Sequence, residues 1–412
     1  MDLRDVPMLF VLGGLIFYVV LAGPDFGAGI WQLFAGRGER GERLRDLSHD
    51  AMAPVWEANH VWLIFVLTVM WTSYPVAFGS IASTLSVALL LAGLGIIGRG
   101  AAYALRSGTR TPAEQRRIDT ASAISSLLTP FALGAAVGGV ASGRVPVGNA
   151  AGDLISSWLN PTSILTGALA VVTAAYLAAV FLSADAVRLD RPDLVDAFRR
   201  RALGAGVVSG ALAIGGLAVI HHDAYPIYHG LVEGHGLPAL IVSVLAGAAT
   251  LALVFARRFE PARYSSALAV AAIVVGWGLA QEPRLLPGLT IHQAAAPHDT
   301  LVAVVIAVLA GGLVVFPSLA LLFRLTLSGT LRGAARAAEV QIAPRAVLAA
   351  SAQGLLVRAA LACLVAGVGL LNVLDPGWAH AIGVVALGAF IVLGFLAALP
   401  QEVLRPPDEE SV

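Results

Sequence analysis

Long apolar segments separated by short polar connections run along the whole chain. Each segment holds about 20 mostly apolar residues, the length that an α-helix needs to cross a hydrocarbon layer about 30 Å thick. A transmembrane β-barrel would instead show segments of about ten residues with alternating polarity. We therefore predict an all-α, polytopic transmembrane helical bundle of eleven spans, at residues 8–33, 51–71, 75–98, 119–141, 163–184, 202–221, 238–256, 264–281, 299–323, 347–373 and 378–399.

The arginines of the connections alternate between the two sides of these spans. The connections after spans one, three, five, seven and nine carry Arg37, Arg40, Arg43, Arg45, then Arg99, Arg106, Arg110, Arg116, Arg117, then Arg188, Arg191, Arg199, Arg200, Arg201, then Arg257, Arg258, Arg263, and finally Arg324, Arg332, Arg336, Arg345. The opposite connections hold only Arg144 and Arg284. Because arginine is enriched in cytoplasmic loops, we expect the N-terminus outside and the C-terminus in the cytoplasm. This orientation requires an odd number of spans, which eleven satisfies.

Composition agrees with a membrane protein and excludes several functions. Hydrophobic residues make up 58% of the chain and charged residues 13%, about half the charged share of an average soluble domain. The net charge is zero, so nothing points to a nucleic-acid partner. All 26 basic residues are arginine, which excludes Schiff-base chemistry on a lysine. The single cysteine, Cys363, cannot form an internal disulfide.

Three ionisable residues in the first two spans are candidates for chemistry. Asp25 lies in the sequence Gly-Pro-Asp-Phe-Gly-Ala-Gly at residues 23–29, and Glu57 and His60 lie three residues apart on one helical face. Such residues are rare in membranes because each costs about 2.5 to 3.5 kcal/mol at a helix centre. A carboxyl and an imidazole so placed could pair, bind a metal or pass a proton, and Glu57 and Asn59 could also join helices.

We expect no metal to bind at the Glu57–His60 pair or at the other histidines of the chain. The Glu57–His60 pair is half of a di-iron motif, but the chain has no second copy. The outer connections and the last span contain further histidines, whose spacing matches no zinc pattern: His221, His222, His229, His235, His292, His298 and His380. We interpret these as solvated residues of the membrane interface.

Several segments resemble subunit II of the cytochrome bd-type quinol oxidases. They are residues 23–29, residues 52–64, the Trp-Thr-Ser-Tyr-Pro turn at 71–75 and the outer loop at 283–297, in the expected order. The resemblance covers about residues 1–330, which we expect to form a nine-helix membrane domain. Residues 331–412 are predicted to be an additional pair of membrane helices with a short cytoplasmic tail.

The resemblance implies a haem-free subunit of a quinol:oxygen oxidoreductase. In this family the haems, here expected to be of types b and d, and the quinol site belong to subunit I, so we expect no cofactor bound directly by this chain. A structural quinone or lipid is left open. The implied partners are subunit I, small single-helix accessory subunits and membrane lipid, and the implied location is the bacterial cytoplasmic membrane.

The resemblance also implies roles for individual residues. Asp25 and Glu57 match acidic positions of a proton route from the cytoplasm, and we place His60 with them. Trp62 matches a tryptophan of an oxygen-access tunnel, with Asn59 and Trp56 beside it on the same helix at the subunit interface. Arg99 matches a basic residue at the inner end of the third helix and is expected to supply an interface charge.

Two departures and three alternatives accompany this interpretation. Some family members have an aspartate where this chain has Ala22, and an acidic residue at the position of Ala104, so the proton route could be shortened or rerouted. The main alternative is a secondary transporter that uses its intramembrane carboxylates. A membrane cytochrome with His60 as haem ligand and a diverged paralogue in another complex are the other two.

Overall fold

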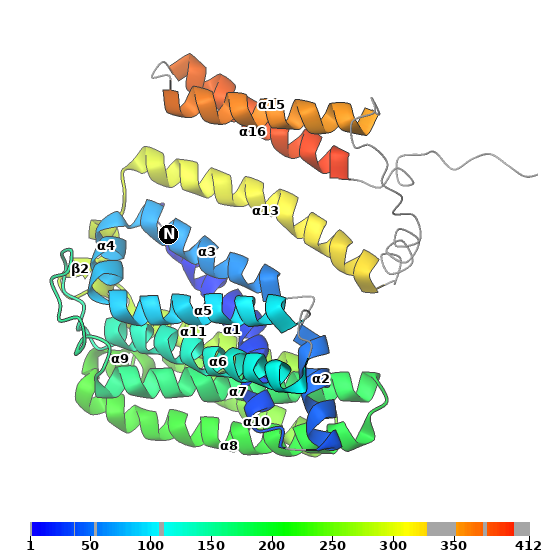
Figure 1. Cartoon of the computed structure of the whole chain (residues 1–412). Helices are drawn as coiled ribbons and strands as arrows, with labels where there is room; N and C mark the ends of the chain where they lie inside the picture. The colour runs from blue at the N-terminus through cyan, green and yellow to red at the C-terminus, as the bar shows by residue number, and fades with distance from the viewer. Residues whose placement is uncertain are drawn as a thin grey trace, which may run out of the picture. The chain divides into compact units, whose positions relative to one another are not determined.

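The computed structural model describes residues 2–36, 38–52, 56–106, 111–327, 352–373 and 377–398. Within these ranges the side chains of residues 49–52, 56–58, 112–113, 319–327, 352–353, 368–369, 371–373 and 397–398 are not described. Within this part the regular secondary structure consists of helices and one small hairpin, and the longest irregular connection joins α6 to α7 (Figure 1). The elements are α1 (Val6–Leu33), α2 (Glu39–Met52), α3 (Trp56–Ser73), α4 (Pro75–Thr84), α5 (Ser86–Arg106), α6 (Pro112–Ala141), α7 (Pro161–Arg188), α8 (Pro192–Asp223), α9 (Tyr225–Val232), α10 (Leu237–Phe255), α11 (Phe259–Gln281), β1 (Arg284–Leu286), β2 (Leu289–Thr290), α12 (Ile291–Ala294), α13 (His298–Leu327), α15 (Ala352–Val373) and α16 (Gly377–Ala398).

Each predicted span coincides with a helix, and the all-α membrane fold is confirmed. Among the described residues, nine helices are long and apolar enough to cross a membrane, and the apolar helices at Asn59–Ser73 and Gly354–Gly367 are shorter. The number of eleven spans and the orientation of the chain stay predictions. The third predicted span differs in detail, because it is interrupted at Leu85 and forms α4 and α5. The helices α2 and α9 lie in stretches that the sequence analysis left as connections.

The chain forms two compact units, Met1–Val314 and Val315–Val412. We call them the N-terminal and the C-terminal unit. The boundary falls within α13, whereas the sequence analysis placed a domain boundary at residue 330, and that assignment stays a prediction. In the C-terminal unit α15 and α16 pack together, and Gly367 brings α15 so close to α16 that a Cβ atom there would lie 2.7 Å from the side chain of Leu387.

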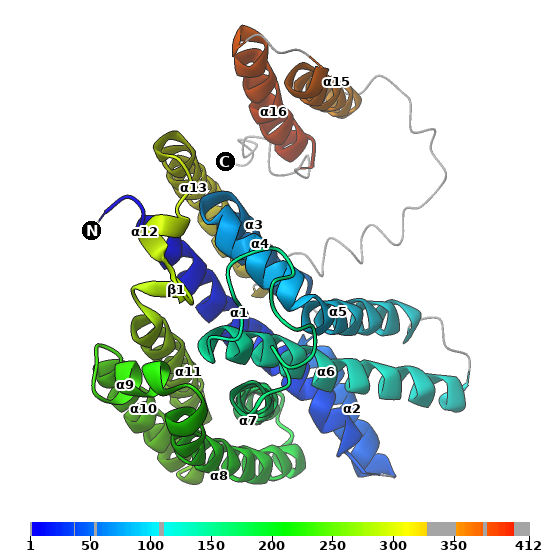
Figure 2. The ribbon, with the colours of Figure 1, turned by 90° about the vertical axis from the view of Figure 1, so that its left-hand side faces the viewer.

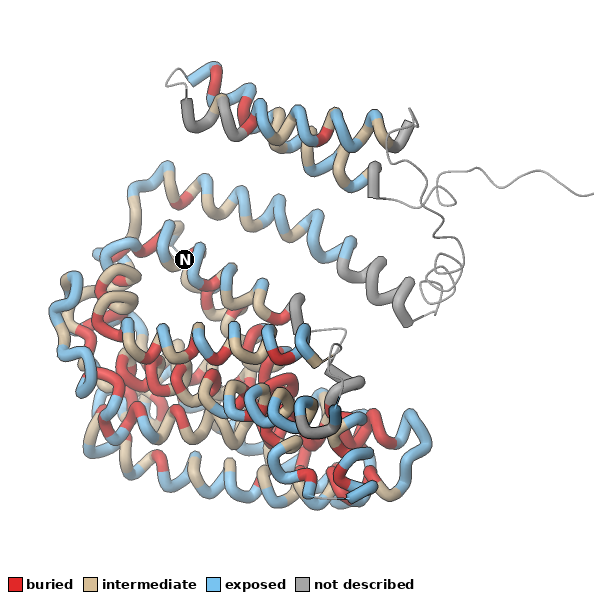
Figure 3. The backbone as a smooth tube through the Cα atoms, in the orientation of Figure 1, coloured by how far each residue is buried: buried red, intermediate tan, exposed pale blue. Residues whose placement is uncertain are grey.

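In the N-terminal unit α1 runs through the middle of the bundle and packs against α3, α6, α7 and α11 (Figure 2). Buried residues concentrate in this central region, whereas the outer helices carry many exposed residues (Figure 3). Apolar residues are among these exposed positions. Leu313 of α13, for example, is 78% exposed and Ile214 of α8 is 71% exposed. An exposed apolar surface of this extent is stable only against lipid or another protein.

Small residues allow the close packing around α1. A Cβ atom on Gly27 would overlap the backbone carbonyl of Ala174 in α7, and one on Gly14 would lie 2.7 Å from Val66 in α3. Helices in a membrane associate through such close contacts because no hydrophobic effect drives them together within lipid.

Polar caps fix where two central helices begin. The hydroxyl of Thr111 accepts a hydrogen bond from the backbone N–H of Glu114 at the start of α6, and the Glu114 carboxylate accepts one from the N–H of Thr111. At the start of α7 the Asn160 side chain accepts a hydrogen bond of 2.9 Å from the N–H of Ser163. These caps satisfy N–H groups that lack partners within the helix.

Contacts between distant segments define two ends of the N-terminal unit. At one end, which we call the arginine-rich end, Arg106 of α5 pairs with Asp46 of α2, and Arg40 of α2 donates to the Asp193 carbonyl at the start of α8. At the opposite end the Tyr74 hydroxyl donates to the carbonyl oxygen of Arg4 at 2.6 Å. The predicted cytoplasmic connections after spans one, three and five thus meet at one end of the bundle.

Candidate functional site

Asp25 lies deep in the N-terminal unit and forms an ion pair between two helices. Only 1% of the residue is exposed. Its Oδ1 atom accepts a hydrogen bond of 2.5 Å from Nη2 of Arg99 in α5, whose other terminal nitrogen donates to the Ser126 hydroxyl in α6, also at 2.5 Å. The Arg99 guanidinium lies over the ring of Phe26, 5.3 Å from its centroid. One arginine thus connects α1, α5 and α6.

The glycine-rich sequence around Asp25 makes room for this pair. A Cβ atom on Gly29 would overlap the Ser126 hydroxyl and lie 2.9 Å from Nη1 of Arg99. Pro24 has no N–H, so the α-helical hydrogen bond to the preceding turn is absent at this point. Because Gly29 has no side chain, the Arg99 guanidinium has room to approach the Asp25 carboxylate.

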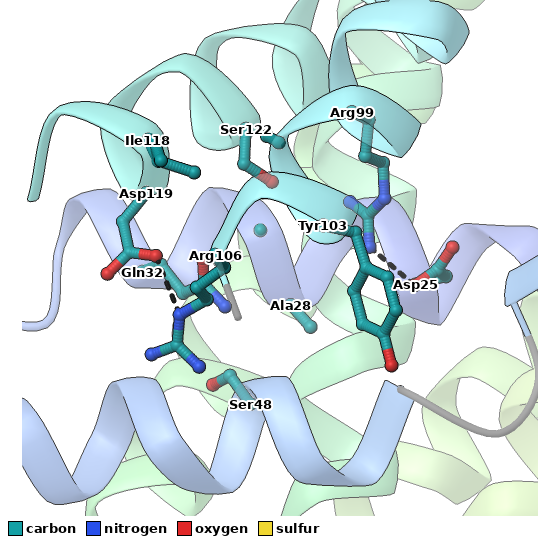
Figure 4. A pocket seen from close by; sticks show the side chains of 12 residues that line it. Asp25, Ala28, Gln32, Ser48, Arg99, Tyr103, Arg106, Ile118, Asp119 and Ser122 are labelled. Carbon is teal, nitrogen blue, oxygen red and sulfur yellow. Dashed lines mark hydrogen bonds and ion pairs between the residues drawn. The ribbon is translucent and has the colours of Figure 1, made fainter. Parts of the chain in front are cut away.

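A small cavity of about 30 Å³ adjoins this ion pair. It is large enough for one or two water molecules, since one water needs about 10–15 Å³. Its lining comes from α1, α2, α5 and α6 (Figure 4): Asp25, Ala28, Gly29, Gln32, Ser48, Arg99, Ala102, Tyr103, Arg106, Ile118, Asp119 and Ser122. The second oxygen of Asp25, Oδ2, is buried and has no hydrogen-bond partner among the described residues.

Charged side chains line the part of the cavity toward the arginine-rich end. Nε of Arg106 donates to Oδ1 of Asp119 at 3.0 Å, as Figure 4 shows, and the same guanidinium lies 3.7 Å from Asp46 of α2. Asp46 is well exposed, with 59% of its side chain accessible, whereas the side chain of Asp119 is 15% exposed. Polar groups therefore extend from an exposed carboxylate to the buried Asp25.

Asn59 and His60 lie in α3, which packs against α1. The buried Asn59 amide donates a hydrogen bond of 3.1 Å to the carbonyl oxygen of Leu21. The His60 ring makes edge contacts with Tyr18 and Phe26, at centroid distances of 6.3 and 6.2 Å. The imidazole thus packs between an aromatic ring on either side of the segment around Ala22 in α1.

The remaining predicted residues of α3 differ in how far the structure describes them. Trp62 stacks on Phe17 at a centroid distance of 4.5 Å and contacts Phe65 edge-on at 6.3 Å, and it does not line the cavity. The side chains of Trp56 and Glu57 lie outside the described residues, so the prediction that Glu57 joins this site is left open.

The sequence analysis missed a stripe of polar residues on α6, of which Asp119 and Ser122 line the cavity. Asp119, Ser122 and Ser126 are spaced three and four residues apart, so they share one helical face, and this spacing could have revealed them. Ala104 is not among the residues that line the cavity, whereas Asp119 is. Ala22 is buried, with 1% exposed.

At the opposite end, the outer histidines contact neighbouring side chains. His292 Nε2 lies 2.8 Å from Oδ1 of Asp5, and His221 packs edge-on against Tyr228 at 4.7 Å. Among the described residues no three histidine, cysteine, aspartate or glutamate side chains gather closely enough to hold a metal ion.

Comparison with known proteins places most of the chain in one group. Residues 3–326 match the sequence profile of the cytochrome bd terminal oxidase subunit II family. A Bacillus subtilis (strain 168) protein, provisionally named cytochrome bd menaquinol oxidase subunit II, is 24% identical over 250 residues, which cover 58% of this chain and 69% of that protein. Cytochrome bd-I ubiquinol oxidase subunit 2 of Escherichia coli (strain K12) is 28% identical over 141 residues, which cover 34% of this chain and 36% of that protein.

The fold is also similar to a solved structure. A chain of the bd oxidase from Geobacillus thermodenitrificans superposes with a TM-score of 0.64 and 26% sequence identity. The match covers 79% of this chain and 99% of that chain. None of these similarities supports the transporter alternative.

Proposed function

The chain belongs to the cytochrome bd terminal oxidase subunit II family, and we propose that within the quinol oxidase complex it carries protons from the arginine-rich end of its bundle to the membrane interior. The single observation that supports this role is the water-sized cavity that ends at Asp25. A subunit that only supported its partner would have no need of a buried carboxylate, which is costly in a membrane.

The ion pair and the cavity assign different tasks to the two oxygens of Asp25. Oδ1 is held by Arg99, so the carboxylate keeps a fixed orientation. Oδ2 has no hydrogen-bond partner among the described residues, so we assign proton acceptance to this oxygen. Arg99 itself remains charged, because a guanidinium does not lose its proton in proteins.

Asp119 is the residue through which protons would enter this route. It lies at the cavity lining, its side chain is partly exposed, and Arg106 holds it in place. From Asp25 the route would continue toward α3, where His60 lies beside Phe26, the residue next to Asp25. Glu57, one turn before His60, is proposed as the next acidic group on the basis of the family resemblance.

We assign the apolar side of α3 to oxygen access and to the contact with the partner subunit. Trp62, Phe17 and Phe65 form an aromatic group beside α1 that an apolar gas could follow. Asn59 ties α3 to α1 and keeps this group in place, and Trp56 extends the same helix. Arg99, expected at an interface, acts in this proposal by orienting Asp25.

The haem chemistry belongs to the complex as a whole. The bd oxidases are haem-based, and we assign the haems of types b and d, with the quinol site, to subunit I. When bound there, the haems reduce oxygen with electrons from quinol, and this chain supplies protons and a binding surface. Small accessory subunits and a bacterial cytoplasmic membrane location are part of the same proposal.

Replacing Asp25 in the assembled complex tests the proton role. Asp25→Asn removes the proton-accepting oxygen at nearly constant shape, and we expect quinol-dependent oxygen consumption to fall about a hundredfold at normal haem content. The matched control is Asp223→Asn, which changes a carboxylate held by Arg144 at the opposite end and should leave turnover unchanged. Normal turnover in Asp25→Asn with normal haem spectra would overturn the proposal.

A further inference from the structure

A second cavity, of about 390 Å³, lies at the arginine-rich end between α2 and α8. Its lining consists of three arginines and three apolar residues: Ala35, Arg40, Leu44, Ala197, Arg200 and Arg201. The volume falls within the range of roughly 300–1,000 Å³ that is usual for small-ligand sites. It is separate from the cavity at Asp25, with which it shares no lining residue.

The positive charges of this cavity have no carboxylate partner among the described residues. Arg40 donates to the backbone carbonyl of Asp193, and Arg201 donates to the carbonyls of Phe34 and Ala197. Arg200 makes no hydrogen bond or ion pair with any described residue. Three guanidinium groups that share one cavity repel one another, and an anion between them would relieve this repulsion.

The two nearest carboxylates of α8 already have other arginine partners. Asp193 lies 3.3 Å from Arg43, and Asp196 lies 2.8 Å from Arg257. These ion pairs direct the acidic side chains to arginines that do not line the cavity. The cavity is therefore a site for an anion from outside the chain.

The position of the cavity indicates which kind of anion reaches it. Arg200 and Arg201 immediately precede the apolar run of α8. Arginines at the end of a membrane helix typically lie at the level of the lipid headgroups. Arg201 lies 5.5 Å from the Trp31 ring centroid, and tryptophan is typical of this interface. Phe34 beside it is 63% exposed and offers an apolar surface for an acyl chain.

We propose that Arg40, Arg200 and Arg201 bind the phosphate group of an anionic phospholipid of the leaflet at the arginine-rich end. Guanidinium groups bind phosphate through charge-assisted hydrogen bonds, often in pairs. Basic pockets between membrane helices on the cytoplasmic side are typical sites for anionic headgroups. The bound lipid would join α2 to α8 through the three arginines. This site does not depend on the proton route.

Lipid binding to the delipidated, purified complex tests the proposal. The probe is fluorescent phosphatidylglycerol in detergent micelles, with phosphatidylcholine as the zwitterionic comparison. We expect Arg200→Gln and Arg40→Gln each to weaken phosphatidylglycerol binding about tenfold, the loss of one charge-assisted contact. Arg258→Gln, which removes an exposed arginine that does not line the cavity, is the matched control and should bind like the wild type.

The haem spectrum and melting temperature establish that each variant complex is intact. Equal binding by Arg200→Gln, Arg40→Gln and wild type would overturn the proposal, and so would equal affinity for phosphatidylcholine. Inorganic phosphate is added as a competitor. If it displaced phosphatidylglycerol at millimolar concentration, the site would bind free phosphate, and the lipid assignment would be wrong.

Discussion

The guanidinium of Arg99 and the carboxylate of Asp25, 74 residues apart in sequence, lie 2.5 Å from each other inside the helical bundle. Their side chains are 11% and 2% exposed, so water screens the pair little. The contact fixes one oxygen of the carboxylate and leaves the other, Oδ2, buried without a hydrogen-bond partner among the described residues. The proposed proton role rests on this division.

Replacing Arg99 alone should destabilise the complex more than replacing both Arg99 and Asp25 by uncharged residues. Arg99→Gln leaves the Asp25 charge buried without a partner, which costs about 3–5 kcal/mol. The double variant Asp25→Asn/Arg99→Gln carries no unpaired charge and should regain most of that loss. Thermal melting of the purified complex measures both. If the single variant melted at or above the temperature of the double variant, the pair would not be as closely coupled as the structure indicates.

A methyl group at Gly29 should disrupt the ion pair by steric overlap. In Gly29→Ala the added Cβ would meet the Ser126 hydroxyl and Arg99 Nη1, so we expect lower stability and lower oxygen consumption. Gly13→Ala in the same helix is the matched control, because no atom lies within 4 Å of its Cβ position. That variant should be neutral or slightly stabilising, since alanine favours helix. Similar behaviour of the two variants would contradict the packing around Arg99.

We expect the hydroxyl group of Ser122, and not only the size of this side chain, to be needed for proton supply. Valine and threonine have nearly the same shape, but only threonine keeps a hydroxyl at the cavity lining. Ser122→Val should therefore slow turnover several-fold, whereas Ser122→Thr should stay close to wild type, because water in the cavity needs polar partners. The measurement is steady-state oxygen consumption at matched haem content. Equal rates for the two variants would indicate that the cavity does not conduct protons.

The sequence was sufficient to predict the helices and to single out Asp25. Continuous apolar segments identify membrane spans directly, and a carboxylate within one is conspicuous because of its cost. The break at Leu85 could not be predicted in this way. It depends on contacts with distant residues: the hydroxyls of Ser80 and Ser83 accept hydrogen bonds from the backbone N–H groups of Gly148 and Ala150.

The residues that contact Asp25 also could not be predicted by considering each residue of the sequence separately. Arg99 stood out only as a basic residue near a helix end, and Arg106 only as one of many arginines in a connection. Their roles depend on how α1, α5 and α6 pack together. The spacing of Asp119, Ser122 and Ser126 was visible in the sequence, but serine is common in membrane helices and gives a weak signal without a cavity next to it.

The contact between Asp5 and His292 at the opposite end should make the loop around α12 sensitive to acid. Burial alone would raise the pKa of the Asp5 carboxyl, but the N–H of Asp2 and the adjacent His292 lower it below its ordinary value of 3.8. The lowered pKa means that the ionised group stabilises the fold above this value and that its contribution is lost as the pH falls through the folded-state pKa. Because the side chains are partly exposed, the effect is small.

Hydrogen exchange of residues 284–294 measures this effect. Asp5→Asn should exchange faster than wild type at about pH 6, and the two should converge once the pH has fallen through the lowered folded-state pKa of Asp5, where the wild-type carboxyl is also protonated. A difference between the two proteins that persisted at the lower pH would contradict the assignment to the Asp5 charge.

Proton uptake during a single turnover tests the central claim most directly. In the fully reduced complex, reconstituted in vesicles and mixed with oxygen, the voltage change across the membrane records protons that move from the arginine-rich end inward. We predict that this phase is present in wild type and in Asp223→Asn and is slowed about a hundredfold in Asp25→Asn, at equal haem content. A phase of wild-type rate and amplitude in Asp25→Asn would contradict the account.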